Sequence, residues 1–101
     1  KQSGAFHAIC GELHRQIDWP RGSGNKISVI AWKRLLVCAW ERVNDRPADV
    51  YPALDGHGFD MVYRRTSRMH KGEMSELIAF AEAWAVENGA ILREPEHADQ
   101  A

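Results

Sequence analysis

The stretch VYPALDGHGFDMVY, residues 50–63, decides the fold class of this 101-residue chain. Two short runs rich in apolar and aromatic residues flank the segment DGHG at 55–58. Asp-Gly favours the positive φ angles of a tight hairpin turn, so we predict an antiparallel hairpin over about residues 50–64. A lone two-stranded hairpin is only marginally stable in water. We therefore expect either that helices cover it, or that strands from a segment outside this sequence or from a partner chain join it.

Apolar residues recur at spacings of three and four in three other segments, which is the pattern of amphipathic helices. A Trp-Pro pair at 19–20 stops the first helix, Ser28 can cap the second, and an Asn-Gly pair at 88–89 can end the third. The predicted helices occupy about residues 4–17, 28–43 and 72–88.

These elements predict an α+β fold, in which three helices pack with a short antiparallel β-hairpin. Length favours a single domain, over residues 1–92, and we expect a flexible acidic tail at 93–101. The 45% of hydrophobic residues indicates a packed core. No apolar run approaches the ~18 residues of a membrane span. Two cysteines do not make a disulfide framework, which favours a reducing compartment.

Positive and negative charges are separated along the sequence. Residues 1–71 hold twelve lysines and arginines against seven acids, whereas residues 72–101 hold one arginine against seven acids, and the net charge is −1. This separation predicts one basic and one acidic surface. A self-complementary dimer or a solubilising tail would produce the same pattern.

The basic charge gathers in YRRTSRMHKGEM, residues 63–74, just before the third helix. Guanidinium groups, hydroxyls and the amides at a helix N-terminus all bind phosphate, and this run combines the three. As an alternative, its arginines could form ion pairs with acids of the next helix, such as Glu73 and Glu76. Glu73 also stands where a capping-box acid would follow His70. The predicted phosphate-binding side chains are Arg64, Arg65, Ser67, Arg68 and Lys71.

Two groups of residues have the chemistry of metal ligands. His7, Cys10 and His14 share one helical face at spacings acceptable for zinc, but Cys10 also belongs to the apolar stripe and no fourth ligand is evident. The carboxylates and imidazole of residues 55–60 are better explained by turn chemistry. We expect neither a metal centre nor a cofactor.

Tryptophans beside cations can stack on unpaired bases, and Trp32 next to Lys33 and Trp19 near Arg21 are the candidates. Tryptophans of a small domain belong more often to its core. The sequence shows no Ser/His/Asp relay, Cys/His nucleophile pattern or phosphate-binding glycine loop. Residue patterns alone therefore predict a small α+β domain with a basic patch.

Three stretches also resemble a known family. RRTSRMHKGEMSELIAFAEAWAVENGA, residues 64–90, is similar to the signature of the NinB, or Orf, recombination proteins of lambda-like phages. KQSGAFHAICGELHRQIDW, residues 1–19, and AWKRLLVCAW, residues 31–40, are similar to two further helices of that family. The resemblance runs in one order over about residues 2–90.

The resemblance implies a phage recombination mediator that is not an enzyme and uses no nucleotide cofactor. Such a protein is expected to form a homodimer and to bind DNA, with single strands preferred over duplex. It would assist the exchange of the host single-strand-binding protein for a recombinase or annealing protein, in the cytoplasm of the bacterial host and away from membranes. The family also carries an N-terminal β-rich segment that this sequence lacks, and we expect that segment to complete the sheet.

The resemblance to the family assigns functional roles to residues at four positions of this chain. Gln2 stands at the family's polar-turn glutamine, Arg68 at the arginine of its Thr-Ser-Arg-Met segment, and Trp32-Lys33 at its Trp-Lys pair. His7 departs from the pattern, because relatives often place a tryptophan there, which weakens any base stacking at this position. The predicted DNA-binding residues are Arg68, Gln2, Arg64, Arg65, Lys71, Ser67, Lys33 and Trp32.

Two alternatives belong to other functional classes. A metal-dependent nuclease acting on recombination intermediates would need a carboxylate such as Glu73. A protein-interaction module would dock an acidic tail on the basic face. The sequence favours the mediator because it supplies cations and hydroxyls without a convincing carboxylate cluster.

Overall fold

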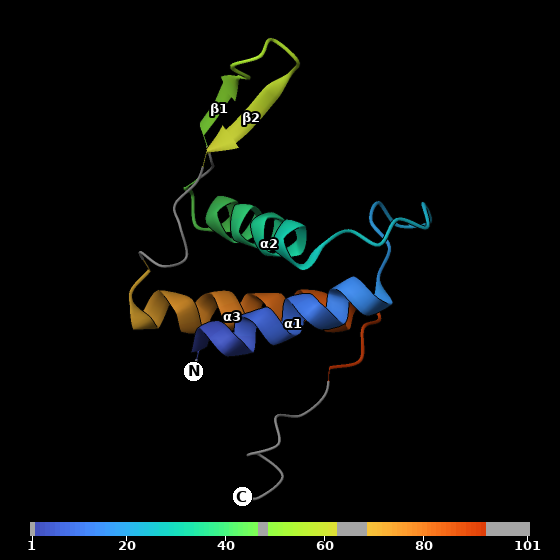
Figure 1. Cartoon of the computed structure of the whole chain (residues 1–101). Helices are drawn as coiled ribbons and strands as arrows, with labels where there is room; N and C mark the ends of the chain where they lie inside the picture. The colour runs from blue at the N-terminus through green and yellow to red at the C-terminus, as the bar shows by residue number, and fades with distance from the viewer. Residues whose placement is uncertain (1, 47–48, 63–68, 93–101) are drawn as a thin grey trace, which may run out of the picture.

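The computed structural model describes residues 2–46, 49–62 and 69–92. Three helices pack together, and a hairpin stands apart from them beyond the end of α2 (Figure 1). The α+β class is confirmed, and each helix begins and ends within two residues of its predicted bounds. The elements in chain order are α1 (Gln2–Gln16), α2 (Val29–Val43), β1 (Asp49–Pro52), β2 (Phe59–Val62) and α3 (Lys71–Glu87). Residues 93–101, predicted as a flexible acidic tail, lie outside the described residues.

The core lies where α1 packs against both α2 and α3. Each helix contributes the apolar stripe seen in its sequence, because side chains three and four positions apart share one face. Burying a large apolar side chain of this kind contributes about 1.5–3 kcal/mol. The buried apolar cluster comprises Phe6, Ile9, Cys10, Leu13, Ile17, Trp32, Leu36, Val37, Trp40, Met74, Leu77, Ala81, Ala85 and Ala90.

Three tryptophans join the helices at one place in this core. Trp32 of α2 contacts Trp19, from the loop after α1, and Trp84 of α3, with ring centroids 5.7 and 5.4 Å away. Trp19 and Trp84 contact each other edge-on, with centroids 5.6 Å apart. Tilted and edge-on pairs of this kind contribute about 0.5–1.5 kcal/mol beyond burial alone.

The predicted helix signals at the start of α2 and the end of α3 are confirmed. The Ser28 hydroxyl accepts a hydrogen bond from the Ala31 N–H over 3.0 Å and so caps α2. At the end of α3, Gly89 has φ +92° and the Ala90 N–H donates to the Ala85 carbonyl over 2.9 Å. This is the Schellman arrangement that glycine allows because it lacks a Cβ atom.

The predicted hairpin is confirmed, but its connection is longer than the tight turn that Asp-Gly favours. β1 and β2 pair antiparallel, with Pro52 opposite Phe59 as the last pair, so the connection spans residues 53–58. The Asp55 carboxylate accepts a hydrogen bond from the His57 N–H over 3.0 Å and so stabilises the turn. The positive φ angles fall on the glycines of this connection, Gly56 at +79° and Gly58 at +108°.

The hairpin lies uncovered by the helices. All eight strand residues are exposed, and the register places Val50, Pro52, Phe59 and Met61 on one face. Among the described residues the sheet has two strands. Of the two alternatives for the hairpin, cover by the helices is not seen in the described part of the chain, and completion of the sheet by an N-terminal segment or a partner chain stays a prediction.

Candidate functional site

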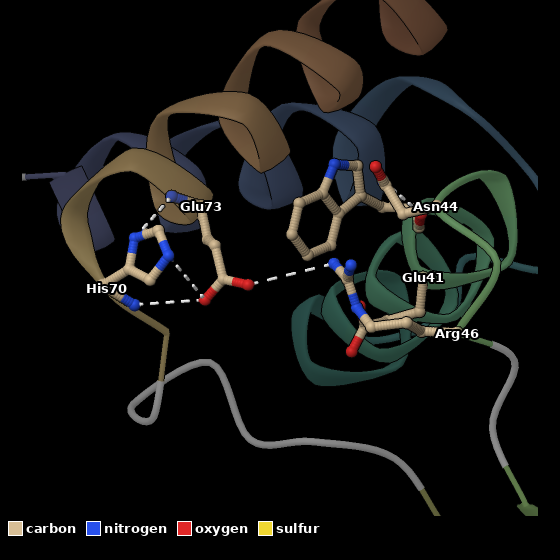
Figure 2. Close-up of polar contacts among 6 residues, drawn as sticks. Glu41, Asn44, Arg46, His70 and Glu73 are labelled. Carbon is tan, nitrogen blue, oxygen red and sulfur yellow. Dashed lines mark hydrogen bonds and ion pairs between the residues drawn. The ribbon is translucent and has the colours of Figure 1, made fainter.

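The start of α3 is held by its own first turn (Figure 2). The His70 Nδ1 accepts the Glu73 N–H, and the Glu73 carboxylate accepts the His70 N–H, each over 3.3 Å. The two contacts form the capping box that the sequence suggested. They define the point at which the basic run enters α3, and Lys71, the first residue of the helix, is exposed there.

Arg46 connects the end of α2 to this capping box (Figure 2). Its Nε donates to Oε1 of Glu41 over 2.9 Å, and its Nη2 lies 3.9 Å from Oε2 of Glu73. The guanidinium carbon also lies 5.2 Å from the centroid of the Trp40 ring, a cation–π distance. Glu41 is 3% exposed, so Arg46 places a positive charge against a buried carboxylate.

Glu73 reduces the ability of the N-terminus of α3 to attract another anion. A helix N-terminus attracts negative charge through its dipole and its amides. Here the Glu73 carboxylate already lies against this terminus and accepts one of its N–H groups. The negative charge of Glu73 therefore already compensates the helix terminus, and the cations and hydroxyls of the basic run would have to bind the phosphates.

The structure leaves part of the predicted DNA-binding set unplaced. Residues 63–68 lie outside the described residues, and with them Arg64, Arg65, Ser67 and Arg68. Gln2 begins α1, and its side chain is likewise outside the description. Lys71 and Lys33 are both exposed. The sequence joins these parts, because residue 63 directly follows β2 and Met69 and His70 directly precede α3.

The prediction for Trp32 is corrected. Its side chain is 1% exposed and is enclosed by Trp19 and Trp84, so it cannot stack on a base. The helical period explains why, since Trp32 and Leu36, four positions apart, share the buried face of α2 whereas Lys33 does not. Trp19, the other stacking candidate, is half-buried in the same cluster.

A cleft of about 430 Å³ opens between the first half of α1, the first half of α2 and the start of α3. Lys33 is the only lysine or arginine that lines it among the described residues. Sequence reasoning missed this cleft, because its walls come from three helices whose packing no local pattern encodes. The lining residues are Gly4, Phe6, His7, Cys10, Val29, Lys33 and Met74.

The residues of the suggested zinc triplet have other contacts. Burial raises the pKa of the Cys10 thiol to about 11, although the nearby charge of Lys33 opposes this rise. The His14 ring faces the loop before α2, with its Nδ1 2.7 Å from the Ile27 carbonyl. Within the described residues, no three His, Cys, Asp or Glu side chains are grouped so as to hold a metal ion.

None of the helices in the described part of the chain is long and apolar enough to span a membrane.

A family model described as NinB protein matches residues 1–92. The chain belongs to the NinB family. Protein ninB of Salmonella phage P22 and protein ninB of Escherichia phage lambda are each 32% identical to it over 88 residues. That alignment covers 87% of this chain and 55% of each relative, so the chain spans about half the length of these NinB proteins.

A solved structure titled "Structural Genomics, NinB" has the same fold. It superposes with a TM-score of 0.71 at 30% sequence identity, over 91% of this chain and 63% of the other. The α+β arrangement of helices and hairpin is thus one that a NinB structure shares.

Proposed function

We propose that this NinB-family chain binds DNA, prefers single strands over duplex, and acts as a mediator in phage recombination. In this role it assists the exchange of a single-strand-binding protein for a recombinase or annealing protein. It works as a homodimer in the cytoplasm of the bacterial host and breaks no bonds. Family membership supports the recombination role.

The observation that carries DNA binding is where the basic run enters the fold. α1 and α3 begin at the same end of the helical layer (Figure 1), and the run leads directly into the start of α3. Lys71 is exposed at that start, and Lys33 lines the cleft between the same helices. Lys71 and Lys33 would face one strand, and the basic run and Gln2 would add further contacts with it. Arginine and lysine side chains gathered in this way neutralise phosphates.

The mechanism follows from counterion release. Each phosphate that a cation neutralises frees a bound counterion, so the slope of log affinity against log salt is about −0.7 per phosphate on single strands. A homodimer doubles the number of cations available to one strand. Binding that weakens steeply with salt lets a mediator release DNA to the next protein.

The nuclease alternative is less well supported by the local geometry. It would use Glu73, whose Oε1 accepts the His70 N–H and whose Oε2 lies 3.9 Å from Arg46. This carboxylate has a clear structural role in joining α2 to α3. The mediator needs no such carboxylate, and we therefore favour it.

The test is fluorescence anisotropy of labelled single-stranded and duplex oligonucleotides, titrated from low to high salt. We expect single strands to bind more tightly, and Arg68→Ala to weaken binding and flatten the salt slope by about 0.7. The matched control is Arg21→Ala, because the loop between α1 and α2 lies at the opposite end of the helical layer (Figure 1). Absence of binding at low salt would contradict the proposal. Capture of an acidic peptide instead would favour the protein-interaction module.

A further inference from the structure

The cleft between α1, α2 and α3 has an apolar floor and a polar rim. Phe6, Cys10 and Met74 line it and are buried, so they form the floor. Lys33 and His7 line it and are exposed, so they belong to the rim. Its volume of about 430 Å³ lies within the range of clefts that hold small molecules, about 300–1,000 Å³.

The floor carries no charge at neutral pH. Phe6 and Met74 are apolar, and burial keeps the Cys10 thiol protonated by raising its pKa to about 11. An uncharged floor of this kind favours an apolar body and disfavours a bare anion, because burying an unpaired charge is costly.

The positive rim favours a ligand that carries a negative group next to its apolar part. Lys33 lines the cleft together with Cys10 and supplies a positive charge at its rim. The His7 ring offers a flat surface on which an unpaired base can stack, although its face is smaller than that of the tryptophan which the resemblance places there. A planar ring with apolar faces attached to an anion satisfies both parts of the cleft, and a nucleotide has this chemistry.

We propose that this cleft is a base-binding subsite, in which one base of a single strand enters between α1 and α2 and Lys33 holds the adjoining phosphate. The subsite rests on the DNA binding proposed above and adds to it a reason for the single-strand preference. A base in a duplex is paired and stacked and cannot enter, whereas an unpaired base can. With an apolar floor, the subsite accepts any base.

Gly4 provides a way to close the cleft without disturbing the core. It lines the cleft, and a Cβ atom built on it meets no other atom within 4 Å. Gly4→Leu therefore adds a bulky side chain to the wall of the cleft without a clash at its Cβ atom. The matched control is Gly11→Leu on the same helix, since Gly11 does not line the cleft and a Cβ there meets only the flexible Arg15 side chain at 3.8 Å.

Lys33 has a matched control one residue away. Lys33→Gln removes the cation that lines the cleft, and Arg34→Gln removes an exposed cation of the same helix that does not line it. This second pair keeps the inference testable if a leucine at position 4 affects folding, which circular dichroism would reveal.

The experiment compares two strands of equal length by anisotropy, an oligothymidine and the same backbone built from abasic nucleotides. Both carry the same phosphates, and only the first carries bases. We expect the chain to bind oligothymidine about tenfold more tightly than the abasic strand, as stacking on a protein surface allows. Gly4→Leu should reduce this ratio towards one. Lys33→Gln should do the same, because Lys33 holds the adjoining phosphate only when a base lies in the cleft. Gly11→Leu and Arg34→Gln should preserve the ratio.

The outcomes separate this inference from the proposed function. Equal affinity for both strands would overturn the subsite and leave phosphate-driven DNA binding intact. A base-dependent affinity that Gly4→Leu and Lys33→Gln leave unchanged would also overturn it, because the bases would then be bound elsewhere. If neither strand binds at low salt, the proposed function fails and the subsite fails with it.

Discussion

At the scale of single residues, Arg46 is a cation with a structural role. It contacts the buried Glu41, the capping acid Glu73 and the Trp40 ring, and so joins α2 to α3. Arg46→Ala should lower the free energy of unfolding by about 1–3 kcal/mol, because it takes the guanidinium partner from a buried carboxylate. Urea denaturation followed by circular dichroism measures the change.

The control for this prediction is Arg34→Ala, which removes an exposed cation of α2. Exposed substitutions of this kind change stability by about 0.5 kcal/mol or less. Equal losses in the two variants would mean that the contacts of Arg46 in Figure 2 contribute no more than a surface charge.

Trp32 and Lys33 show what a residue pattern can and cannot predict. The family's Trp-Lys pair predicts a DNA contact for both, whereas Trp32, three positions after Val29 and four before Leu36, also stands at apolar helical spacing. The helical spacing is the better guide for Trp32, because burial follows the helical period. A match to a two-residue pair does not indicate whether a side chain points to the core or to solvent. Lys33 is exposed, as its place off the stripe requires.

At the scale of helices and strands, local signals predicted the ends of the helices well. Ser28, Glu73 and the Asn-Gly pair at 88–89 each act through hydrogen bonds within a few residues, so the sequence contains the whole interaction. The length of the hairpin connection was less predictable, because it depends on where strand pairing stops. The cleft was not predictable at all, since three separate helices form it.

Capping by Ser28 leads to a prediction for α2. Ser28→Ala should lower the free energy of unfolding by about 1 kcal/mol, because the Ala31 N–H loses its hydrogen-bond acceptor. His70→Ala at α3 should cost less, since its contacts of 3.3 Å are longer than the 3.0 Å contact of Ser28. Thermal and urea denaturation of both variants measure the costs.

Ser28→Asp and His70→Asn are the matched controls for these caps. Aspartate and asparagine are good N-cap residues, so both variants should retain most of the stability of the parent chain. A loss in Ser28→Asp as large as that in Ser28→Ala would show that the side chain at position 28 does not stabilise α2 by capping.

At the scale of the whole molecule, the chain divides into a packed helical core and an uncovered hairpin (Figure 1). The sequence predicted both parts, because segments with apolar residues at spacings of three and four differ clearly from strand-like segments around a turn. It did not predict that the strand residues in the described part of the chain are all exposed, because burial depends on tertiary packing. The basic run joins the two parts in sequence, between β2 and the start of α3.

This division predicts that the hairpin contributes little to the stability of the helical core. Phe59 is 72% exposed, so Phe59→Ser should change the free energy of unfolding by about 0.5 kcal/mol or less. Leu77 is fully buried in α3, and Leu77→Ala should cost about 2–5 kcal/mol. Urea denaturation followed at a helical wavelength compares the two, and amide hydrogen exchange should be faster in β1 and β2 than in α1. If Phe59→Ser instead destabilised the helices as strongly as Leu77→Ala, the hairpin and the core would unfold as one cooperative unit, and the exposed apolar face would have to be covered in solution.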